Sequence, residues 1–423
     1  MIPPIRCVRS PMKARTTIAG TVLLLLASGG AVGPPLAETG APIDRGLVAR
    51  GAELAAIGNC VTCHTSAEGK SFAGGRPLAT PFGTLYSTNI TPDPETGIGR
   101  WSEADFLRAM HEGVGRDGRE LYPAFPYDHF TRVTDDDVAA LYAFIMTREP
   151  VRAEPPTNRL RFPMSLRSSI KLWKAAYFRP GVHRNDPSHD AEWNRGAYLV
   201  EGLAHCGACH TPRNALGAEV GDRSLAGGDV EDWHATALAI DSPAPERWTA
   251  DQLYAYLRYG REPQHGIAAG PMADVTYNLA NVAEADVRAI AVYVASRMSG
   301  QSSPRTEAGP RPASSDGEQI FAGACAVCHD GASPALATAT IPLAVTTSLN
   351  APDPRNAIHV ILEGIEPESG EKGALMPGFR AELTDAQVGA LVDYLRARFT
   401  DRPAWRDVVQ QVGAIRRSPK EAS

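Results

Sequence analysis

Apolar residues recur at helical spacing in three stretches of the chain, each near the end of a longer segment. The stretches are D-D-V-A-A-L-Y-A-F-I (136–145), A-D-V-R-A-I-A-V-Y-V (285–294) and A-Q-V-G-A-L-V-D-Y-L (386–395). Apolar side chains that return every three or four residues line one face of a helix. Each stretch therefore predicts a helix with one buried face.

A second helix is predicted ahead of each of these. It covers 101–113 in the first segment and 248–260 in the second, and it opens at Asp353-Pro354 in the third. Proline suits the first helical position, where its missing N–H would have no intrahelical partner. The first two of these helices start with residues that resemble capping boxes, namely Ser102 with Asp105 and Thr249 with Gln252.

A short helical stretch precedes each of these pairs, at 50–54, 195–199 and 316–321. The same order of helices therefore occurs three times, and no segment reads convincingly as a sheet strand. The predicted fold class is all-α, with three tandem domains joined by irregular linkers. The expected division is domain 1 at 44–150, a linker at 151–190, domain 2 at 191–300, a linker at 301–315, domain 3 at 316–400 and a tail at 401–423.

Composition supports a globular protein. Of the 423 residues, 43% are hydrophobic and 21% are charged. Glycine (39) and proline (34) are frequent enough to indicate loop-rich domains. The formal net charge is −6, so nothing indicates a nucleic-acid partner.

The first 37 residues have the pattern of a signal peptide. Basic residues precede an apolar run at 16–27, and small residues follow it. A cut after Ala31 or Ala37 fits this pattern, and Cys7 would be removed with the segment. The alternative is an uncleaved membrane anchor, although the apolar run is short for a spanning helix. We therefore expect export to the periplasmic side of a bacterial inner membrane.

Six of the seven cysteines fall in one five-residue pattern that occurs three times, as C-V-T-C-H, C-G-A-C-H and C-A-V-C-H. Disulfides give no reason for a histidine after each second cysteine. A zinc site would need a fourth ligand for each motif, and thioredoxin-type chemistry uses a single pair. The pattern is typical of covalent haem attachment, which predicts three haem c groups. The attachment residues are Cys60, Cys63, Cys206, Cys209, Cys325 and Cys328.

The histidine that ends each motif is the expected proximal iron ligand: His64, His210 and His329. Electron carriers usually add a sixth ligand, most often Met. The loop before the last helix supplies Met272 in the second repeat and Met376 in the third. A loop methionine can also serve only to fill the hydrophobic core. Both methionines lie in the loop before the last helix of their repeat, however, and this position favours ligation of the haem iron.

The first repeat departs from this pattern. Its loop reads L-Y-P-A-F-P-Y-D-H-F (121–130), with Phe125 where Met is expected. We predict His129 as the sixth ligand, since it lies in the same loop. Met110 aligns with core positions of the other repeats and Met146 lies beyond the last apolar turn. A five-coordinate haem, or an exposed loop histidine, are the alternatives for this repeat.

The stretches R-G-A-Y-L-V-E-G-L-A-H-C-G-A-C-H-T-P-R-N (195–214) and F-G-T-L-Y-S-T-N-I-T-P-D-P-E-T-G-I-G-R-W-S (82–102) carry more than a haem motif. The chain resembles, over roughly 44–400, the tri-haem cytochrome c subunit of bacterial membrane-bound periplasmic dehydrogenases. That resemblance implies electron transfer from a catalytic subunit to ubiquinone or a terminal acceptor. Partners in this family are quinoprotein alcohol dehydrogenases, flavin-dependent sugar or gluconate dehydrogenases and molybdenum hydroxylases.

In the alcohol branch of this family the first loop reads Y-P-A-M-P-Y, and Phe125 departs from it. The departure favours a molybdenum hydroxylase as the partner. Nothing in the sequence resembles a substrate site, so we expect no catalysis by this chain. Two alternatives stay open, namely a haem enzyme that reduces a small molecule at a five-coordinate first haem, and a free periplasmic electron shuttle.

The tail contains an amphipathic stretch, P-A-W-R-D-V-V-Q-Q-V-G-A-I-R-R (403–417). Its apolar residues share one helical face, and two arginines follow at its end. Such a helix can lie on a membrane surface. It can equally pack against the surface of its own cytochrome, so a membrane surface is one of two expectations for this segment.

Overall fold

The computed structural model describes residues 44–299, 315–330, 341–365 and 376–418. The expected signal peptide at 1–37 lies outside the described residues. The predicted second linker at 301–315 also lies outside them, apart from the backbone of its last residue.

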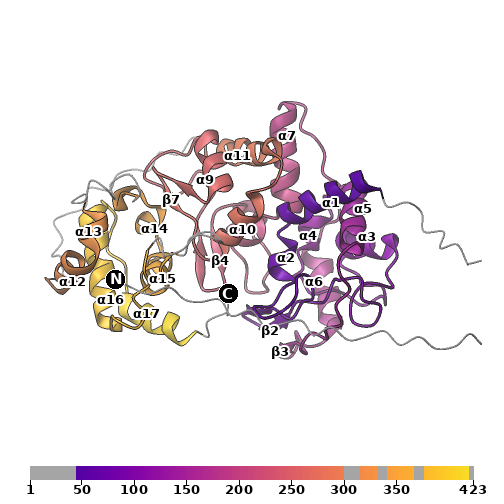
Figure 1. Ribbon diagram of the computed structural model, residues 1–423, viewed down its shortest axis with the longest axis horizontal. Helices are drawn as coiled ribbons and strands as arrows, with labels where there is room; N and C mark the ends of the chain where they lie inside the picture. Colours follow the sequence, from indigo (N-terminus) through magenta and orange to yellow (C-terminus); the bar gives the residue numbers. More distant parts are fainter. Residues whose placement is uncertain (1–43, 300–314, 331–340, 366–375, 419–423) are drawn as a thin grey trace, which may run out of the picture. The chain divides into compact units, whose positions relative to one another are not determined.

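The first repeat holds five helices and a hairpin (Figure 1). Its elements are α1 (Arg45–Ile57), α2 (Cys60–Cys63), β1 (Pro77–Thr80), β2 (Gly83–Tyr86), α3 (Glu103–Glu112), α4 (Tyr127–Phe130) and α5 (Asp135–Met146). The chain then forms β3 (Arg159–Leu160) and α6 (Arg167–Tyr177) before the second repeat begins.

The second and third repeats follow the same order of helices. The second contains α7 (Ala191–Tyr198), the π-helical turn η1 (Leu199–Leu203), α8 (Gly207–His210), η2 (Gly221–Arg223), β4 (Gly228–Val230), β5 (Trp233–Ala235), α9 (Ala250–Tyr259), β6 (Arg261–Glu262), β7 (Gly266–Ile267), α10 (Pro271–Leu279) and α11 (Glu284–Met298). The third contains α12 (Ser315–Ile320), η3 (Phe321–Cys325), α13 (Ala326–His329), η4 (Leu343–Val345), α14 (Thr347–Asn350), α15 (Arg355–Glu363) and α16 (Asp385–Phe399), and α17 (Val408–Arg417) ends the described chain.

The helices predicted from apolar spacing are confirmed. The stretch 136–145 lies within α5, 285–294 within α11 and 386–395 within α16. Both predicted capping boxes are formed, at the start of α3 and of α9, and α16 begins with a third one. These caps satisfy backbone N–H groups that have no intrahelical partner, which fixes where each helix starts.

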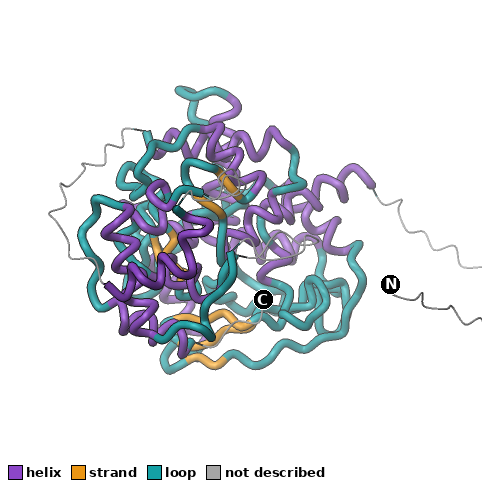
Figure 2. The backbone as a smooth tube through the Cα atoms, turned by 60° about the vertical axis from the view of Figure 1, so that its left-hand side comes forward, coloured by secondary structure: helices purple, strands orange, loops and turns teal. Residues whose placement is uncertain are grey.

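The expectation of no strands was wrong. Short antiparallel pairs form between β1 and β2, β4 and β5, and β6 and β7, and β3 adds to β2. Figure 2 shows these few strands among helices and long loops. All of them have four residues or fewer, too short for an alternating pattern to be recognised in the sequence. The protein is still mainly helical.

The segment 151–190 is not the irregular linker that we expected. It contains β3 and α6, and both lie on the first repeat. Gly83 of β2 pairs with Leu160 of β3, and Ile170 of α6 is buried. The amphipathic pattern of α6 was hidden by the many arginines and prolines around it.

Three glycines occupy the same place in the three repeats, where the first helix crosses the last. A Cβ on Gly51, Gly196 or Gly317 would lie 1.9, 2.0 or 2.2 Å from the carbonyl oxygen of Ala140, Ala289 or Ala390. Only glycine allows the two backbones to approach so closely. The same residue type at the same crossing shows that the repeats share their packing as well as their order.

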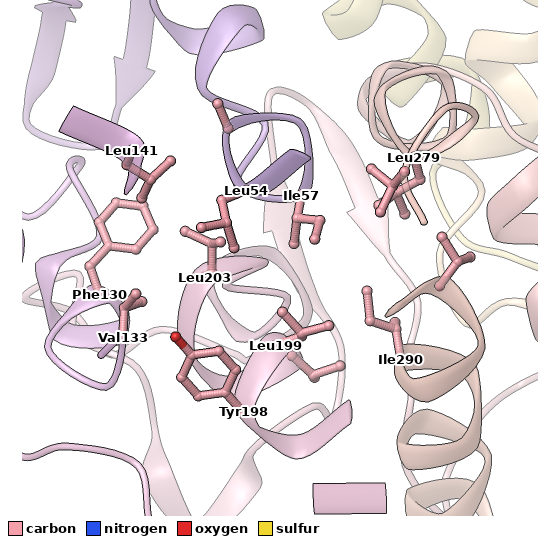
Figure 3. Close-up of a cluster of buried hydrophobic side chains, with 14 of the residues drawn as sticks. Leu54, Ile57, Phe130, Val133, Leu141, Tyr198, Leu199, Leu203, Leu279 and Ile290 are labelled. Atoms are coloured by element: carbon pink, nitrogen blue, oxygen red, sulfur yellow. The ribbon is translucent and has the colours of Figure 1, made fainter. Parts of the chain in front are cut away.

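Two hydrophobic clusters form the interior of the described part of the chain. One joins the first two repeats, and Leu54, Leu199, Leu203 and Ile290 are among its members (Figure 3). The other belongs to the third repeat and includes Phe321 and Val412. The second cluster therefore extends to α17 in the tail.

The amphipathic face of the tail is covered by the third repeat. Val408, Val412 and Ile415 of α17 are buried in the second cluster. Trp405, which precedes the helix, is also buried, and its indole N–H donates to the carbonyl of Ala351 at 3.1 Å. The tail helix therefore packs against its own cytochrome, which is the second of the two expectations for this segment. Among the described residues, no helix has the length and apolarity that crossing a bilayer requires.

Candidate haem sites

The first two motif histidines are held in the same way. His64 Nδ1 lies 2.7 Å from the carbonyl oxygen of Thr88, and His210 Nδ1 lies 2.7 Å from that of Thr236. A carbonyl only accepts, so Nδ1 carries the proton in each ring and Nε2 keeps its lone pair. Burial lowers the pKa of both histidines, which favours the neutral ring that binds iron.

The third motif histidine lies in a similar short helix, α13. Burial lowers the pKa of His329 as well. Within the described part of the chain, its buried Nδ1 has no hydrogen-bond partner. The residues directly after this motif, 331–340, lie outside the described residues. His329 is half-buried, as His64 is, and like His64 and His210 it favours the neutral ring.

Five of the six motif cysteines carry free thiols, namely Cys60, Cys206, Cys209, Cys325 and Cys328. Burial raises the pKa of Cys60 and of Cys206 to about 12, and that of Cys209 to about 11. Redox-active and metal-bound cysteines have lowered pKa values instead. Each pair stands one helical turn apart, at the two ends of α2 in the first repeat. Neutral thiols at this spacing fit two thioether bonds to one edge of a haem.

A cavity of about 990 Å³ extends along the motifs, and apolar side chains form most of its lining. Nine of the twelve predicted site residues line it: Cys63, Cys206, Cys209, His210, Cys325, Cys328, His329, Met272 and Met376. Cys60, His64 and His129 do not. An apolar cavity with thiols and imidazoles at its wall suits haem, so the nine residues that line it fit that group.

The two predicted methionines both line the cavity. Met272 is the second residue of α10, directly after Pro271. Met376 is held by a short bridge, because its N–H donates to the carbonyl of Ile365 at 3.1 Å and its carbonyl accepts from Ile365 at 2.9 Å. Both thioethers therefore lie in the part of the fold that the sequence indicated.

His129 has other partners for both of its ring nitrogens. Nδ1 lies 2.9 Å from the carbonyl of Glu201, and Nε2 lies 2.8 Å from a carboxylate oxygen of Glu219. Burial alone would lower the pKa of His129, but the hydrogen bond and charge of Glu219 outweigh burial and raise it. His129 as an iron ligand stays a prediction, and it requires the pair with Glu219 to open.

Phe125 also lies apart from the cavity lining. It packs in the first hydrophobic cluster, with its ring centroid 5.2 Å from that of Phe130. The cavity side of the same loop is formed by Tyr122, Pro123, Ala124 and Pro126. Sequence reasoning missed Met164, which lines the cavity from the segment after the first repeat. The sequence feature that could have indicated it is a methionine four residues after Leu160. Leu160 lies in a strand, but we had assigned this segment to a linker.

Comparisons with known proteins agree with this geometry. The family model for cytochrome c matches residues 48–149, and that for cytochrome c oxidase, cbb3-type, subunit III matches residues 312–395. Helical repeats with these motifs define a c-type cytochrome.

Among curated relatives, the fructose dehydrogenase cytochrome subunit of Gluconobacter japonicus is 37% identical over 94% of this chain and 88% of its own length. The gluconate 2-dehydrogenase cytochrome c subunit of Pantoea cypripedii is 36% identical over 88% of this chain and 90% of its own length. The chain belongs to the family of dehydrogenase cytochrome c subunits. It is an electron-transfer subunit rather than a catalytic one.

A nicotinate dehydrogenase subunit of Pseudomonas putida is 47% identical over 88% of this chain. The chain spans about a third of the length of that relative, since it covers 32% of it.

Proposed function

We propose that this chain is a tri-haem cytochrome that relays electrons from a catalytic dehydrogenase subunit to ubiquinone or a terminal acceptor. The observation that carries the proposal is the same motif in three places, each with a histidine whose pKa is lowered by partial or full burial beside two thiols. Haem bound there would supply one-electron chemistry. The protein holds the haem by its cysteines and excludes water with an apolar wall.

The proposed attachment residues are the six cysteines named above, with His64, His210 and His329 as proximal ligands. Met272 and Met376 are the proposed sixth ligands of the second and third haems. We assign one haem to each of three cytochrome domains, at 44–150, 191–300 and 316–400. The equivalent glycine crossings at Gly51, Gly196 and Gly317 support this division.

We propose a molybdenum hydroxylase as the catalytic partner. Nicotinate is an N-heterocycle, and a nicotinate dehydrogenase subunit is 47% identical to this chain, against 37% for the fructose and 36% for the gluconate dehydrogenase subunits. Phe125 in the first loop supports the same choice. A flavin or quinoprotein dehydrogenase is the alternative, because those relatives align with the chain over nearly their full length.

We propose that the complex acts on the periplasmic side of the inner membrane, after export directed by residues 1–37. Covalent haem attachment fits an exported protein. The acceptor, ubiquinone or a terminal oxidase, would receive electrons from one end of the haem series.

The test is the content of the native complex, purified through a tag on this chain. We expect three haems per chain by the pyridine haemochrome assay, and one fewer after Cys60→Ser with Cys63→Ser, or after the matching change in either other motif. A count that stays the same in one of these variants would remove that haem from the proposal. Stoichiometric molybdenum is expected, and bound flavin or quinone cofactor in its place would move the partner to the alternative classes.

A further inference from the structure

We propose that Met164 is the sixth ligand of the first haem. The inference rests on the proposed haem at Cys60 and Cys63. It concerns the one repeat whose own loop presents no methionine to the cavity.

The loop of the first repeat leaves the ligand position to another segment. Tyr122, Pro123, Ala124 and Pro126 line the cavity there, and none of them carries a sulfur atom or an imidazole. The phenol of Tyr122 donates to the carbonyl of Met164 at 3.2 Å, so this loop touches the segment that follows the repeat. Phe125 turns into the hydrophobic cluster instead.

Met164 lines the same cavity as Cys63 of the first motif. Leu85, Leu160 and Ile170 line it as well, and all three belong to the first repeat or to the segment paired with it. The hydroxyl of Ser169 lies 3.9 Å from the sulfur of Met164 and can donate to it. A thioether sulfur has two lone pairs, so one such contact leaves the second pair for iron.

The backbone around Met164 is fixed on both sides. Before it, β3 pairs with β2, and the N–H of Arg161 donates to the carbonyl of Phe82 at 2.9 Å. After it, α6 is anchored by the buried Ile170 and by a 2.6 Å ion pair between Lys174 and Glu120. A ligand needs such support to stay in place when iron changes its charge.

The rival side chains are committed elsewhere. Met110 is buried in the core and Met146 packs against it, and neither lines the cavity. His129 uses both ring nitrogens. His205 does line the cavity, but it directly precedes Cys206 of the second motif, and its Nδ1 lies 2.9 Å from the carbonyl of Leu203.

The test compares Met164→Leu with Met146→Leu in the full-length haem-loaded chain. Leucine keeps the volume of methionine and removes the sulfur. We expect Met164→Leu to keep its full haem content. The long-wavelength absorption band that methionine ligation gives ferric haem should lose the intensity contributed by one haem. One ferrous haem of the variant should also bind carbon monoxide. Its first haem should also fall in potential, since methionine ligation raises it. Met146→Leu should resemble the unchanged protein in all four measurements.

Met164→His provides a rescue. It should close the site to carbon monoxide again, with a lower potential than the methionine form and without recovery of the band. An unchanged band and no carbon monoxide binding in Met164→Leu would overturn the proposal. Carbon monoxide binding at one haem of His129→Gln or His205→Gln would then identify that histidine as the ligand. Carbon monoxide binding by the unchanged protein at one haem would also overturn it.

Failure of this inference is separable from failure of the proposed function. If Cys60→Ser with Cys63→Ser does not lower the haem count, the first haem is absent and the proposed function is wrong at that site. If the count falls as expected but Met164→Leu has no spectral effect, the haem stands and only the ligand assignment fails.

Discussion

A Cβ atom on Gly196 would lie 2.0 Å from the carbonyl oxygen of Ala289, where α7 crosses α11. It would also lie 2.7 Å from Cβ of Tyr293. A Cβ atom on Gly51 would lie at the same distance, 2.7 Å, from Cβ of Phe144. Both contacts are shorter than real carbon contacts allow. The last helix of each repeat is therefore seated on the first through a glycine that no other residue can replace without a shift of the backbone.

Gly196→Ala should lower the stability of the second repeat by about 1–3 kcal/mol, the usual cost of forcing an extra methyl group into a packed site. The measurement is the guanidinium midpoint followed by haem absorbance. Gly221→Ala is the control, because a Cβ there has no atom within 4 Å, and its effect should stay within about 0.5 kcal/mol. Equal midpoints for the two variants would contradict the close crossing.

One network of charged residues between the first two repeats contains Arg50, Asp137, Arg195 and Asp286. Arg195 holds Asp286 through two bonds of 2.8 and 2.9 Å, and Arg50 of the first repeat lies 3.4 Å from both Asp286 and Asp137. Arg50 and Arg195 each precede the crossing glycine of their repeat, while the third repeat has Asp316 there. The pairing is therefore nearly symmetrical between the first two repeats and is not available to the third.

Asp286→Asn should cost about 1–3 kcal/mol, since it leaves Arg195 without its main charged partner. Burial alone would raise the pKa of Asp286, but the hydrogen bonds and charges of Arg195 and Arg50 outweigh burial and lower it. The pKa of Asp286 is lower in the folded protein than in the unfolded chain, where it is about 3.9. The stabilisation is therefore fully present at pH values above the unfolded-state pKa, and it is lost as the pH falls through the folded-state pKa. Thermal unfolding should thus show a gap between the variant and the unchanged protein at neutral pH that closes in acid.

The control for this measurement is Asp251→Asn. Asp251 pairs with Arg288 at 2.9 Å, but its side chain is 86% exposed. Exposed pairs contribute roughly 0–1 kcal/mol. If Asp286→Asn lowers the unfolding temperature no more than Asp251→Asn does, the network adds no stability. If its loss of unfolding temperature is the same in acid as at neutral pH, the loss does not come from the charge of Asp286.

The sequence predicted the helices well because their signals are local. Apolar spacing marks α5, α11 and α16, and the capping boxes of α3 and α9 depend on residues three positions apart. The three cysteine motifs are equally local. Their positions at the cavity follow from helices that the same local signals define.

The first-repeat ligand could not be predicted in the same way. The place of Met164 depends on β3 pairing with β2 and on α6 docking, and both contacts join residues far apart in the chain. The partners of His129, Glu201 and Glu219, are 72 and 90 residues away from it. Nothing in the loop 121–130 itself shows that its histidine already has partners. Packing, rather than pattern, decides which side chain reaches the cavity.

Lys174→Met should release α6 from the first repeat. Lys174 donates to Glu120 at 2.6 Å and to the carbonyl of Glu112, and both charged side chains are nearly buried. Removing one partner of a buried pair costs about 3–5 kcal/mol, because the other charge is left uncompensated. Limited proteolysis should then cut within 159–181 faster. Lys171→Met on the exposed side of the same helix should leave the cleavage rate unchanged, and an equal rate in both variants would contradict this role of Lys174.

Ile415→Ala should destabilise the third repeat, because α17 is part of its core. Ile415 is 4% exposed and packs in the cluster of Phe321 and Val412. Deletion of a buried Ile to Ala costs about 2–5 kcal/mol. Val409→Ala, at a position 47% exposed on the same helix, should change the unfolding midpoint little. Because the apolar face is covered, neither variant should alter binding to anionic phospholipid vesicles. Weaker vesicle binding by Ile415→Ala, with an unchanged midpoint, would instead mean that this face leaves the third repeat to contact the membrane.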